Sequence, residues 1–236
     1  MANFSLDISA AVSTAWEYAK KYGLLIAVIY LLVGVVSGGL HSIVGPSMAL
    51  GDQQAITEAI GRGDWESIGK MAQAYNTGIG SNISTMFSGI ITTIVSVGLY
   101  NLALGLMSGR FSEVTFDAFK LPFATYLKVF VVSFITGLIC VVACFFCIIP
   151  VFFVAPRLIL APVYQVEHPE AGIGESISAA WKMTSDNTMS MLGLGIVMVG
   201  IIILGFCCCC IGMYFAQAIE LFALIAAYNQ LKGNLQ

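Results

Sequence analysis

Residues 129–166 read VFVVSFITGLICVVACFFCIIPVFFVAPRLILAPVYQV, and Arg157 is the only charged residue among them. As one α-helix this stretch would be roughly 57 Å long at ~1.5 Å per residue, nearly twice the ~30 Å hydrocarbon core of a lipid bilayer. The chain must therefore turn back on itself inside the stretch. We predict this turn at residues 147–150, because Pro150 has no amide hydrogen with which to continue a helix.

A second stretch of the same kind covers residues 191–231, where Glu220 is the only charged residue. We expect this stretch to turn back near residues 210–212. Two shorter apolar stretches are each long enough for one crossing of the membrane. The sequence therefore predicts an all-α, polytopic membrane protein with six transmembrane helices, at residues 24–43, 86–108, 129–149, 151–166, 191–209 and 212–231.

The composition of the whole chain agrees with this interpretation. Of the 236 residues, 58% are hydrophobic and 10% are charged, whereas a soluble domain has roughly 25% charged residues. The mean hydropathy is +0.91. The net charge of -3 gives no sign of the basic surface that a nucleic-acid partner requires. We therefore expect membrane lipids, and no nucleic acid, around this protein.

The basic residues predict the orientation of the helices, because Lys and Arg are enriched in cytoplasmic segments. With six spans, only Arg62 and Lys70 fall on the outer side, and Arg157 lies within the membrane. The cytoplasmic side receives Lys20, Lys21, Arg110, Lys120, Lys128, Lys182 and Lys232. We therefore predict a multi-pass protein of a bacterial inner (cytoplasmic) membrane, with both termini in the cytoplasm.

The outer segment, residues 46–85, is the one sizeable soluble part in this topology. Asp52 and Asp64 are placed to cap the N-termini of two short amphipathic helices. We expect these helices to lie on the membrane or to cover the helix bundle. Another membrane protein is a possible partner for this segment.

A nine-residue pattern occurs twice in the chain. Residues 8–16 (ISAAVSTAW) align without gaps on residues 173–181 (IGESISAAW), and the apolar positions of both fall on one helix face. Ser5 and Glu175 are candidates to begin these helices, and residues 115–119 carry a weaker third copy. The alternative is coincidence in an apolar sequence.

If the repeat is real, the chain consists of three units, 1–110, 111–167 and 168–236. Each unit has an amphipathic helix followed by a pair of membrane helices. The aromatic residue of each amphipathic helix, which is Trp16, Phe119 or Trp181, is then expected at the level of the lipid headgroups, where aromatic rings are favoured.

Four short motifs lie between residues 105 and 231. They are Phe116-Asp-Ala-Phe119, Ile148-Ile-Pro150, Ala161-Pro-Val-Tyr164, and Glu175-Ser-Ile-Ser-Ala-Ala-Trp181 followed by Thr184. Together they resemble the membrane domain attached to some glycerophosphodiester phosphodiesterases and its stand-alone, uncharacterised bacterial relatives. The resemblance implies a six-helix membrane domain without a settled activity, and the phosphodiesterase chemistry does not carry over. Val151 replaces the glycine of the family, and residues 185–187 replace its Lys-Gly-Asn.

Three polar residues in predicted spans need an explanation, because a charge at the membrane centre costs about 2.5–3.5 kcal/mol on insertion scales. They are Asn101, Arg157 and Glu220, each followed by Leu and each at a similar predicted depth. We predict that Arg157 and Glu220 form a buried ion pair to which Asn101 hydrogen-bonds. Such a pair either fixes the register of the helices or forms a binding or proton-relay site.

Pro150, Pro156 and Pro162 interrupt the fourth predicted span every six residues. Transporters use broken helices of this kind at substrate sites, while the simpler interpretation is a kinked helix whose free carbonyls are satisfied by neighbours or water.

The cysteines form two groups, one at Cys140, Cys144 and Cys147 and the other at residues 207–210. We interpret them as small apolar filler. A disulfide between the two groups, lipidation and, last, a structural metal are the alternatives.

No nucleophile motif, zinc-protease signature or phosphate-binding loop appears in the sequence. We predict a non-catalytic membrane protein without a cofactor or metal, either an accessory or scaffold subunit or a lipid-interacting protein. The alternative is a small transporter whose path uses Arg157 and Glu220. A transporter needs a water-accessible cavity that reaches Arg157, whereas a scaffold seals this residue by packing.

Overall fold

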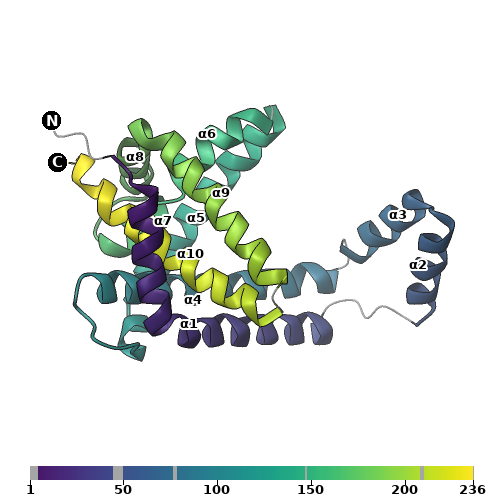
Figure 1. Cartoon of the computed structure of the whole chain (residues 1–236). Coiled ribbons are helices and arrows are strands. Elements are labelled where there is room, and N and C mark those ends of the chain that lie inside the picture. The colour runs from purple at the N-terminus through teal and green to yellow at the C-terminus, as the bar shows by residue number, and fades with distance from the viewer. Residues whose placement is uncertain (1–4, 45–49, 77–78, 147, 208–209, 236) are drawn as a thin grey trace. The chain divides into compact units, whose positions relative to one another are not determined.

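The computed structural model describes residues 5–44, 50–76, 79–146, 148–207 and 210–235, and all regular structure in these ranges is helical. The helices appear in Figure 1. In chain order they are α1 (Ile8–Val44), α2 (Leu50–Arg62), α3 (Trp65–Asn76), α4 (Ile79–Met107), η1 (Phe116–Phe119), α5 (Phe123–Phe146), α6 (Ile148–Leu158), α7 (Ala161–Glu167), α8 (Ile173–Thr184), η2 (Ser185–Asn187), α9 (Thr188–Cys207), α10 (Cys210–Leu231) and η3 (Lys232–Leu235).

The chain divides into two compact units. The first contains residues 1–31 and 93–236, and therefore holds every predicted polar residue of the membrane region. The second contains residues 32–92, with α2, α3 and the adjoining parts of α1 and α4. The three predicted repeat units do not coincide with this division and stay a prediction.

Four helical segments in the described part of the chain are long and apolar enough to cross a membrane. They are Ile8–Gly39, Thr85–Met107, Phe123–Phe145 and Ile173–Cys207. They contain or largely overlap the predicted spans at 24–43, 86–108, 129–149 and 191–209. An all-helical chain with several helices of membrane-spanning length is therefore established.

The predicted fourth span, residues 151–166, is wrong as a single helix. Residues 148–158 form α6 and residues 161–167 form α7, with a two-residue turn between them. At ~1.5 Å per residue, α6 is about 16 Å long and too short to cross a bilayer alone. Pro162, in the first turn of α7, explains the new start, since proline fits the first helical positions, where no amide donor is needed.

Both long apolar stretches are broken into two helices close to the predicted turns, but residues 148–150 already belong to α6 and residues 210–212 to α10. Helix α5 ends at Phe146 and α6 begins at Ile148, with Cys147 outside the described residues. Helix α9 ends at Cys207 and α10 begins at Cys210, and the two helices of each pair pack together. Pro150 lies inside α6, near its start, and so follows the break by three residues.

The two copies of the nine-residue pattern begin helices at equivalent positions, Ile8 and Ile173. The caps differ from the prediction for Ser5, because the Asp7 carboxylate accepts the Ala10 amide at 3.0 Å. The Glu175 carboxylate accepts the Gly172 amide at 3.2 Å, as expected for a capping residue. The weaker copy at residues 115–119 forms only the short helix η1.

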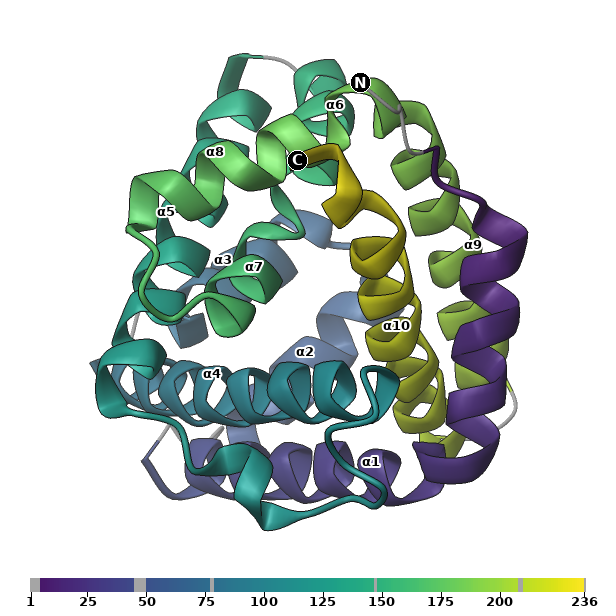
Figure 2. The ribbon, with the colours of Figure 1, turned by 90° about the vertical axis from the view of Figure 1, so that its left-hand side faces the viewer.

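Helix α10 forms the centre of the first unit. It lies beside α9 and the N-terminal part of α1 (Figure 2). Phe222 and Tyr228 are fully buried. The ring of Trp16 meets Phe215 edge-on at 6.3 Å, and the ring of Tyr18 lies 5.5 Å from Phe222. In a lipid environment such contacts stabilise by close packing rather than by removal of water.

Close packing in the first unit depends on glycine at several positions. A Cβ atom added at Gly205 would collide with the backbone of Gly212, and one at Gly212 with the backbone of Gly205, so α9 and α10 meet without side chains between them. A Cβ at Gly98 would collide with the ring of Phe119. Gly109 has a φ of +75°, which ends α4 in the left-handed conformation that favours glycine.

In the second unit, Asp64 caps α3 as predicted. Its carboxylate accepts the Ser67 amide at 3.1 Å. Hydrogen bonds from Ser67 hold the pKa of this carboxyl below its usual value. The prediction for Asp52 is wrong, because α2 already begins at Leu50. Residues 46–49 and 77–78 of the predicted outer segment lie outside the described part.

Candidate functional site

Arg157 stands at the C-terminal end of α6 and contacts α8 and α9. Its Nε atom donates to the Thr188 hydroxyl at 3.0 Å. Its guanidinium carbon lies 4.6 Å from the centre of the Trp181 ring, a cation–π contact. The side chain is half-buried. The guanidinium is therefore held at the level of α8, next to the aromatic residue predicted to lie among the lipid headgroups.

The predicted ion pair between Arg157 and Glu220 is absent. Ion pairs in the described ranges involve other residues, and no salt bridge or hydrogen bond joins these two. The physical reason is their placement: Arg157 is engaged by Trp181 and Thr188, while Glu220 faces a cavity between three helices.

Asn101 also has partners other than those predicted. Its amide donates to the carbonyl of Ala118 at 2.8 Å, and its carbonyl oxygen accepts from Arg110 at 3.4 Å. This buried side chain therefore ties α4 to η1 rather than to the other two polar residues. The three polar residues expected to form one cluster occupy three separate environments.

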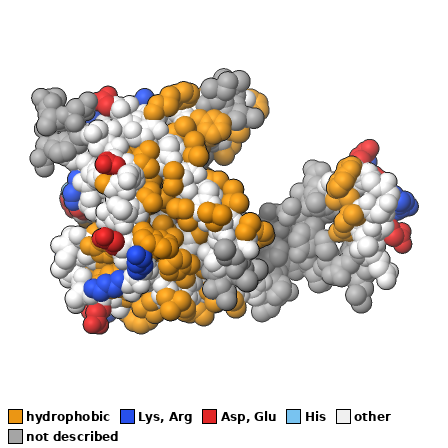
Figure 3. Space-filling view, viewed as in Figure 1, with side chains coloured by type: hydrophobic (Ala, Val, Ile, Leu, Met, Phe, Trp, Pro, Cys, Tyr) orange, Lys and Arg blue, Asp and Glu red, His pale blue; other side chains and the backbone are white. Residues whose placement is uncertain are grey.

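The cavity that Glu220 faces lies between α6, α9 and α10 and has a volume of about 500 Å³. This is within the roughly 300–1,000 Å³ typical of small-molecule sites. Apart from Glu220, its lining is apolar or glycine: Val151, Phe152, Ala155, Pro156, Ile159, Met191, Leu192, Leu194, Gly195, Ile196, Met198, Val199, Ile202 and Leu224. Hydrophobic side chains also cover the neighbouring outer surface of α9 (Figure 3).

The three prolines contribute to this region in different ways. Pro156 stands inside α6 and lines the cavity. Pro150 lies near the start of α6, and Pro162 lies at the start of α7, where proline causes little disruption. Only Pro156 therefore interrupts the interior of a helix at the cavity.

Of the three predicted interfacial anchors, Trp16 and Trp181 are exposed. Phe119 is half-buried, and its ring fills the space over Gly98. Phe116, three residues earlier, is 86% exposed. In this part of the chain Phe116, rather than Phe119, presents its ring to the surroundings.

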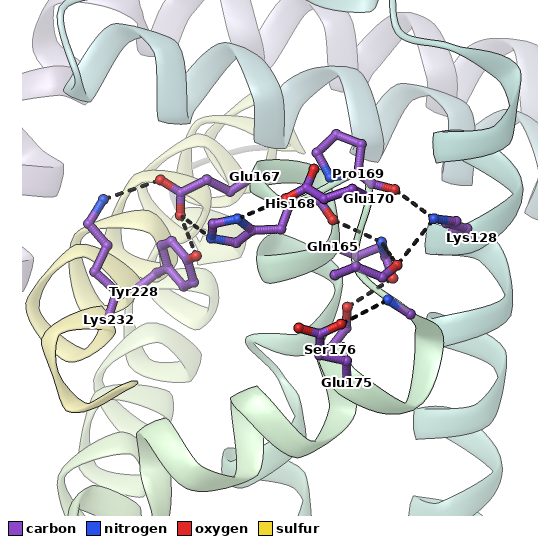
Figure 4. A network of polar contacts seen from close by, with 12 residues as sticks. Lys128, Gln165, Glu167, His168, Pro169, Glu170, Glu175, Ser176, Tyr228 and Lys232 are labelled. Carbon is purple, nitrogen blue, oxygen red and sulfur yellow. Dashed lines mark hydrogen bonds and ion pairs between the residues drawn. The ribbon is translucent and has the colours of Figure 1, made fainter. Parts of the chain in front are cut away.

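A polar network that the sequence analysis missed joins α5, α7 and α8 (Figure 4). The fully buried Gln165 accepts from Ser176 at 2.9 Å and donates to the carbonyls of His168 and Ala171 at 3.2 Å. Lys128 donates to the carbonyls of Pro169 and Ala171 at 2.7 and 3.2 Å. These bonds fix the connection between α7 and α8. No short motif marks the network, because its members are far apart in sequence.

A second polar group stands at the C-terminal end of α10. The Glu167 carboxylate accepts a short hydrogen bond from Tyr228 and pairs with Lys232 at 3.2 Å. His168 lies near the carboxylates of Glu167 and Glu170, at 3.9 and 3.5 Å. All of these side chains except Glu170 border an open cavity of about 850 Å³. Since the acid is already bound by a phenol and an ammonium group, the cluster connects α7 to α10.

The described cysteines Cys140, Cys144 and Cys207 are free thiols. Cys147, Cys208, Cys209 and the side chain of Cys210 lie outside what the structure describes, so the disulfide alternative stays untested. Within the described residues, no group of three or more His, Cys, Asp or Glu side chains is arranged to hold a metal ion.

No family model, no curated protein and no solved structure matches the chain. The family resemblance of residues 105–231 therefore stays a prediction, and any function has to be argued from the cavity and the residues around it.

Proposed function

We propose that this is a non-catalytic integral membrane protein that binds a lipid, with an acyl chain in the cavity between α6, α9 and α10. The observation that carries the proposal is the lining of this cavity, which is apolar except for Glu220. A site with such a lining matches a hydrocarbon chain and offers almost no hydrogen-bonding groups to a polar substrate. An accessory or scaffold role in the membrane is compatible with lipid binding.

Gly195 is an exposed residue of α9 that lines the cavity. A Cβ atom added there would meet no other atom within 4 Å. The space beside this glycine is therefore free for a ligand, and a large side chain at this position would enter the cavity without displacing the backbone.

The alternative function, a small transporter of a polar substrate, needs a polar path through the protein. Arg157, on which that path was expected to depend, is not among the residues that line the cavity. It is held by Thr188 and Trp181 instead. This arrangement favours lipid binding over transport of a polar substrate.

The variant Gly195→Phe tests the proposal, with Gly200→Phe as its matched control. Gly200 lies on the same helix, and an added Cβ there also meets nothing within 4 Å, but this glycine does not line the cavity. Binding of a phospholipid with a fluorescent acyl chain is measured on protein purified in detergent. We expect Gly195→Phe to lose binding and Gly200→Phe to retain it. Equal binding by both variants, or no binding by the wild type, contradicts the proposal.

The variant Glu220→Gln separates lipid binding from transport of a cation. An acyl chain beside Glu220 has to tolerate a charge in an apolar site, which is unfavourable. Replacing the acid by a neutral amide is therefore expected to leave lipid binding unchanged or to strengthen it. A cationic substrate would lose its only acidic partner in the cavity lining, so loss of ligand binding in this variant would favour the transporter.

A further inference from the structure

The guanidinium of Arg157 has hydrogen-bonding capacity that the protein leaves unused. Thr188 accepts the Nε–H group. The two terminal amino groups of the guanidinium have no hydrogen-bond acceptor among the described residues, and no carboxylate pairs with them. These N–H groups are not among the buried polar atoms that lack a partner, so they are accessible to an anion that comes from outside the chain.

The guanidinium of Arg157 lies close to the apolar cavity between α6, α9 and α10. Pro156, the residue before Arg157, lines the cavity. Thr188, which holds the Nε atom, is one turn before Met191 and Leu192, which also line it. The guanidinium therefore stands beside the end of the cavity formed by the C-terminus of α6 and the N-terminus of α9.

Glu220 belongs to a different level of the same cavity. Helices α9 and α10 pack as a hairpin, so Glu220, ten residues after Cys210, faces the middle of α9 rather than its first turn. The position opposite Glu220 on α9 is near residue 197, nine residues after Thr188, which is roughly 14 Å of helix at ~1.5 Å per residue. The cation and the acid are therefore apart, with the apolar lining between them.

Trp181 orients the guanidinium. The Trp181 ring, 4.6 Å away, contacts the face of the planar guanidinium, and Thr188 binds its Nε edge. The terminal N–H groups that remain form the fork that recognises phosphate. Trp181 is 41% exposed, so the fork is close to the surface of the protein.

We propose that Arg157 binds the phosphate of an anionic phospholipid whose acyl chain occupies the cavity between α6, α9 and α10. This inference rests on the proposed function and adds the class of lipid. The phosphate supplies the missing acceptor for the terminal N–H groups, and the chain leads from it into the apolar lining. Trp181 and Thr188 position the guanidinium for this contact.

The test compares phosphatidylglycerol with a diacylglycerol of identical acyl chains, which lacks the phosphate, as competitors for the fluorescent phospholipid. The wild type is expected to prefer phosphatidylglycerol. In Arg157→Gln the ratio of the affinities for the two competitors is expected to fall about tenfold, the effect of one charge-assisted hydrogen bond. The variant is expected still to bind lipid. Lys182→Gln removes the positive charge of an exposed residue on α8 and is expected to keep the preference. If Arg157→Gln does not fold, Arg157→Lys is used, which is expected to weaken the preference because Lys lacks the planar fork.

The outcomes separate the two proposals. If Arg157→Gln or its Lys substitute binds lipid with an unchanged preference, the phosphate contact is wrong and the lipid-binding function stands. If the wild type binds neither lipid, both proposals fail. If free glycerol phosphate displaces the fluorescent lipid, the site recognises a soluble phosphate, which overturns the assignment to a lipid.

Discussion

Arg157 makes its cation–π contact with Trp181, 4.6 Å from the ring centre, and forms neither a hydrogen bond nor an ion pair with Glu220. Both residues of this contact come from the region where α6 meets α8. Because Trp181 holds the guanidinium, Arg157 does not lie beside Glu220, the acid that was expected to neutralise it. This placement leaves the cation beside one end of the apolar cavity and the single acid of the lining at another level of the same cavity.

A double-mutant cycle measures this relationship. The coupling energy between Arg157→Gln and Trp181→Leu is expected to be about 0.5–2 kcal/mol, the range of a cation–π contact. The coupling between Arg157→Gln and Glu220→Gln is expected to be close to zero. Unfolding in mixed micelles supplies the free energies. A coupling of several kcal/mol between Arg157 and Glu220 would restore the ion pair and refute the placement described above.

Tyr228→Phe is expected to destabilise the first unit by about 1.5–3 kcal/mol, because it removes the hydrogen bond to a charged acceptor, Glu167. Tyr164→Phe is the control, since the Tyr164 hydroxyl has no hydrogen bond in the described structure. Thermal unfolding of the two variants is compared. Equal melting temperatures for the two would show that the hydroxyl of Tyr228 contributes nothing.

Gly205→Leu is expected to separate α9 from α10, since even a Cβ atom at this position collides with the backbone of Gly212. The expected cost is about 1–3 kcal/mol, typical of overpacking. Gly200→Leu, where an added Cβ meets nothing within 4 Å, is expected to unfold like the wild type. Retention of wild-type stability by Gly205→Leu, measured in the same experiment, would contradict the close packing of this hairpin.

The N-terminus of α3 is expected to loosen in acid. Hydrogen bonds from Ser67 lower the pKa of Asp64 in the folded chain, so the ionised cap stabilises α3 above the ordinary carboxyl pKa of about 4. This contribution is lost as the pH falls through the lower pKa of the folded state. Hydrogen exchange at the first amides of α3 is the measurement.

Asp64→Asn is the matched variant, because Asn caps a helix as well as Asp does but does not titrate. Its exchange rates, corrected for intrinsic chemistry, are expected to stay constant over the same pH range. A parallel acid response in this variant would assign the loosening to another group.

The helical class and the two hairpins follow from features that are local in the sequence. A charge-poor stretch longer than a bilayer has to break, and Pro150 and Gly212 lie within a few residues of the two breaks, each in the first turn of the helix that follows. The break between α6 and α7 was harder to predict, because three prolines in sequence do not tell which one starts a new helix and which one is tolerated.

The partners of the polar residues depend on the rotation of each helix about its axis, which similar depth in the sequence does not determine. Arg157 and Pro156 are neighbours in sequence, yet one contacts α8 and the other lines the cavity. Gln165 and Tyr228 were missed for a related reason: each looks like an isolated polar residue in an apolar helix until the fold brings its partners from 11 and 61 residues away.

The most direct test of lipid binding in the cavity is photo-crosslinking in bilayer nanodiscs with a phosphatidylglycerol that carries a diazirine in the middle of one acyl chain. Adduct positions are mapped by mass spectrometry of peptides. Adducts are expected on cavity-lining residues of α6, α9 and α10, such as Met198 and Leu224, and are expected to disappear in Gly195→Phe but not in Gly200→Phe. Adducts confined to the exposed faces of α5 and α9, and unchanged in Gly195→Phe, would show that the chain stays in the surrounding bilayer and contradict the account.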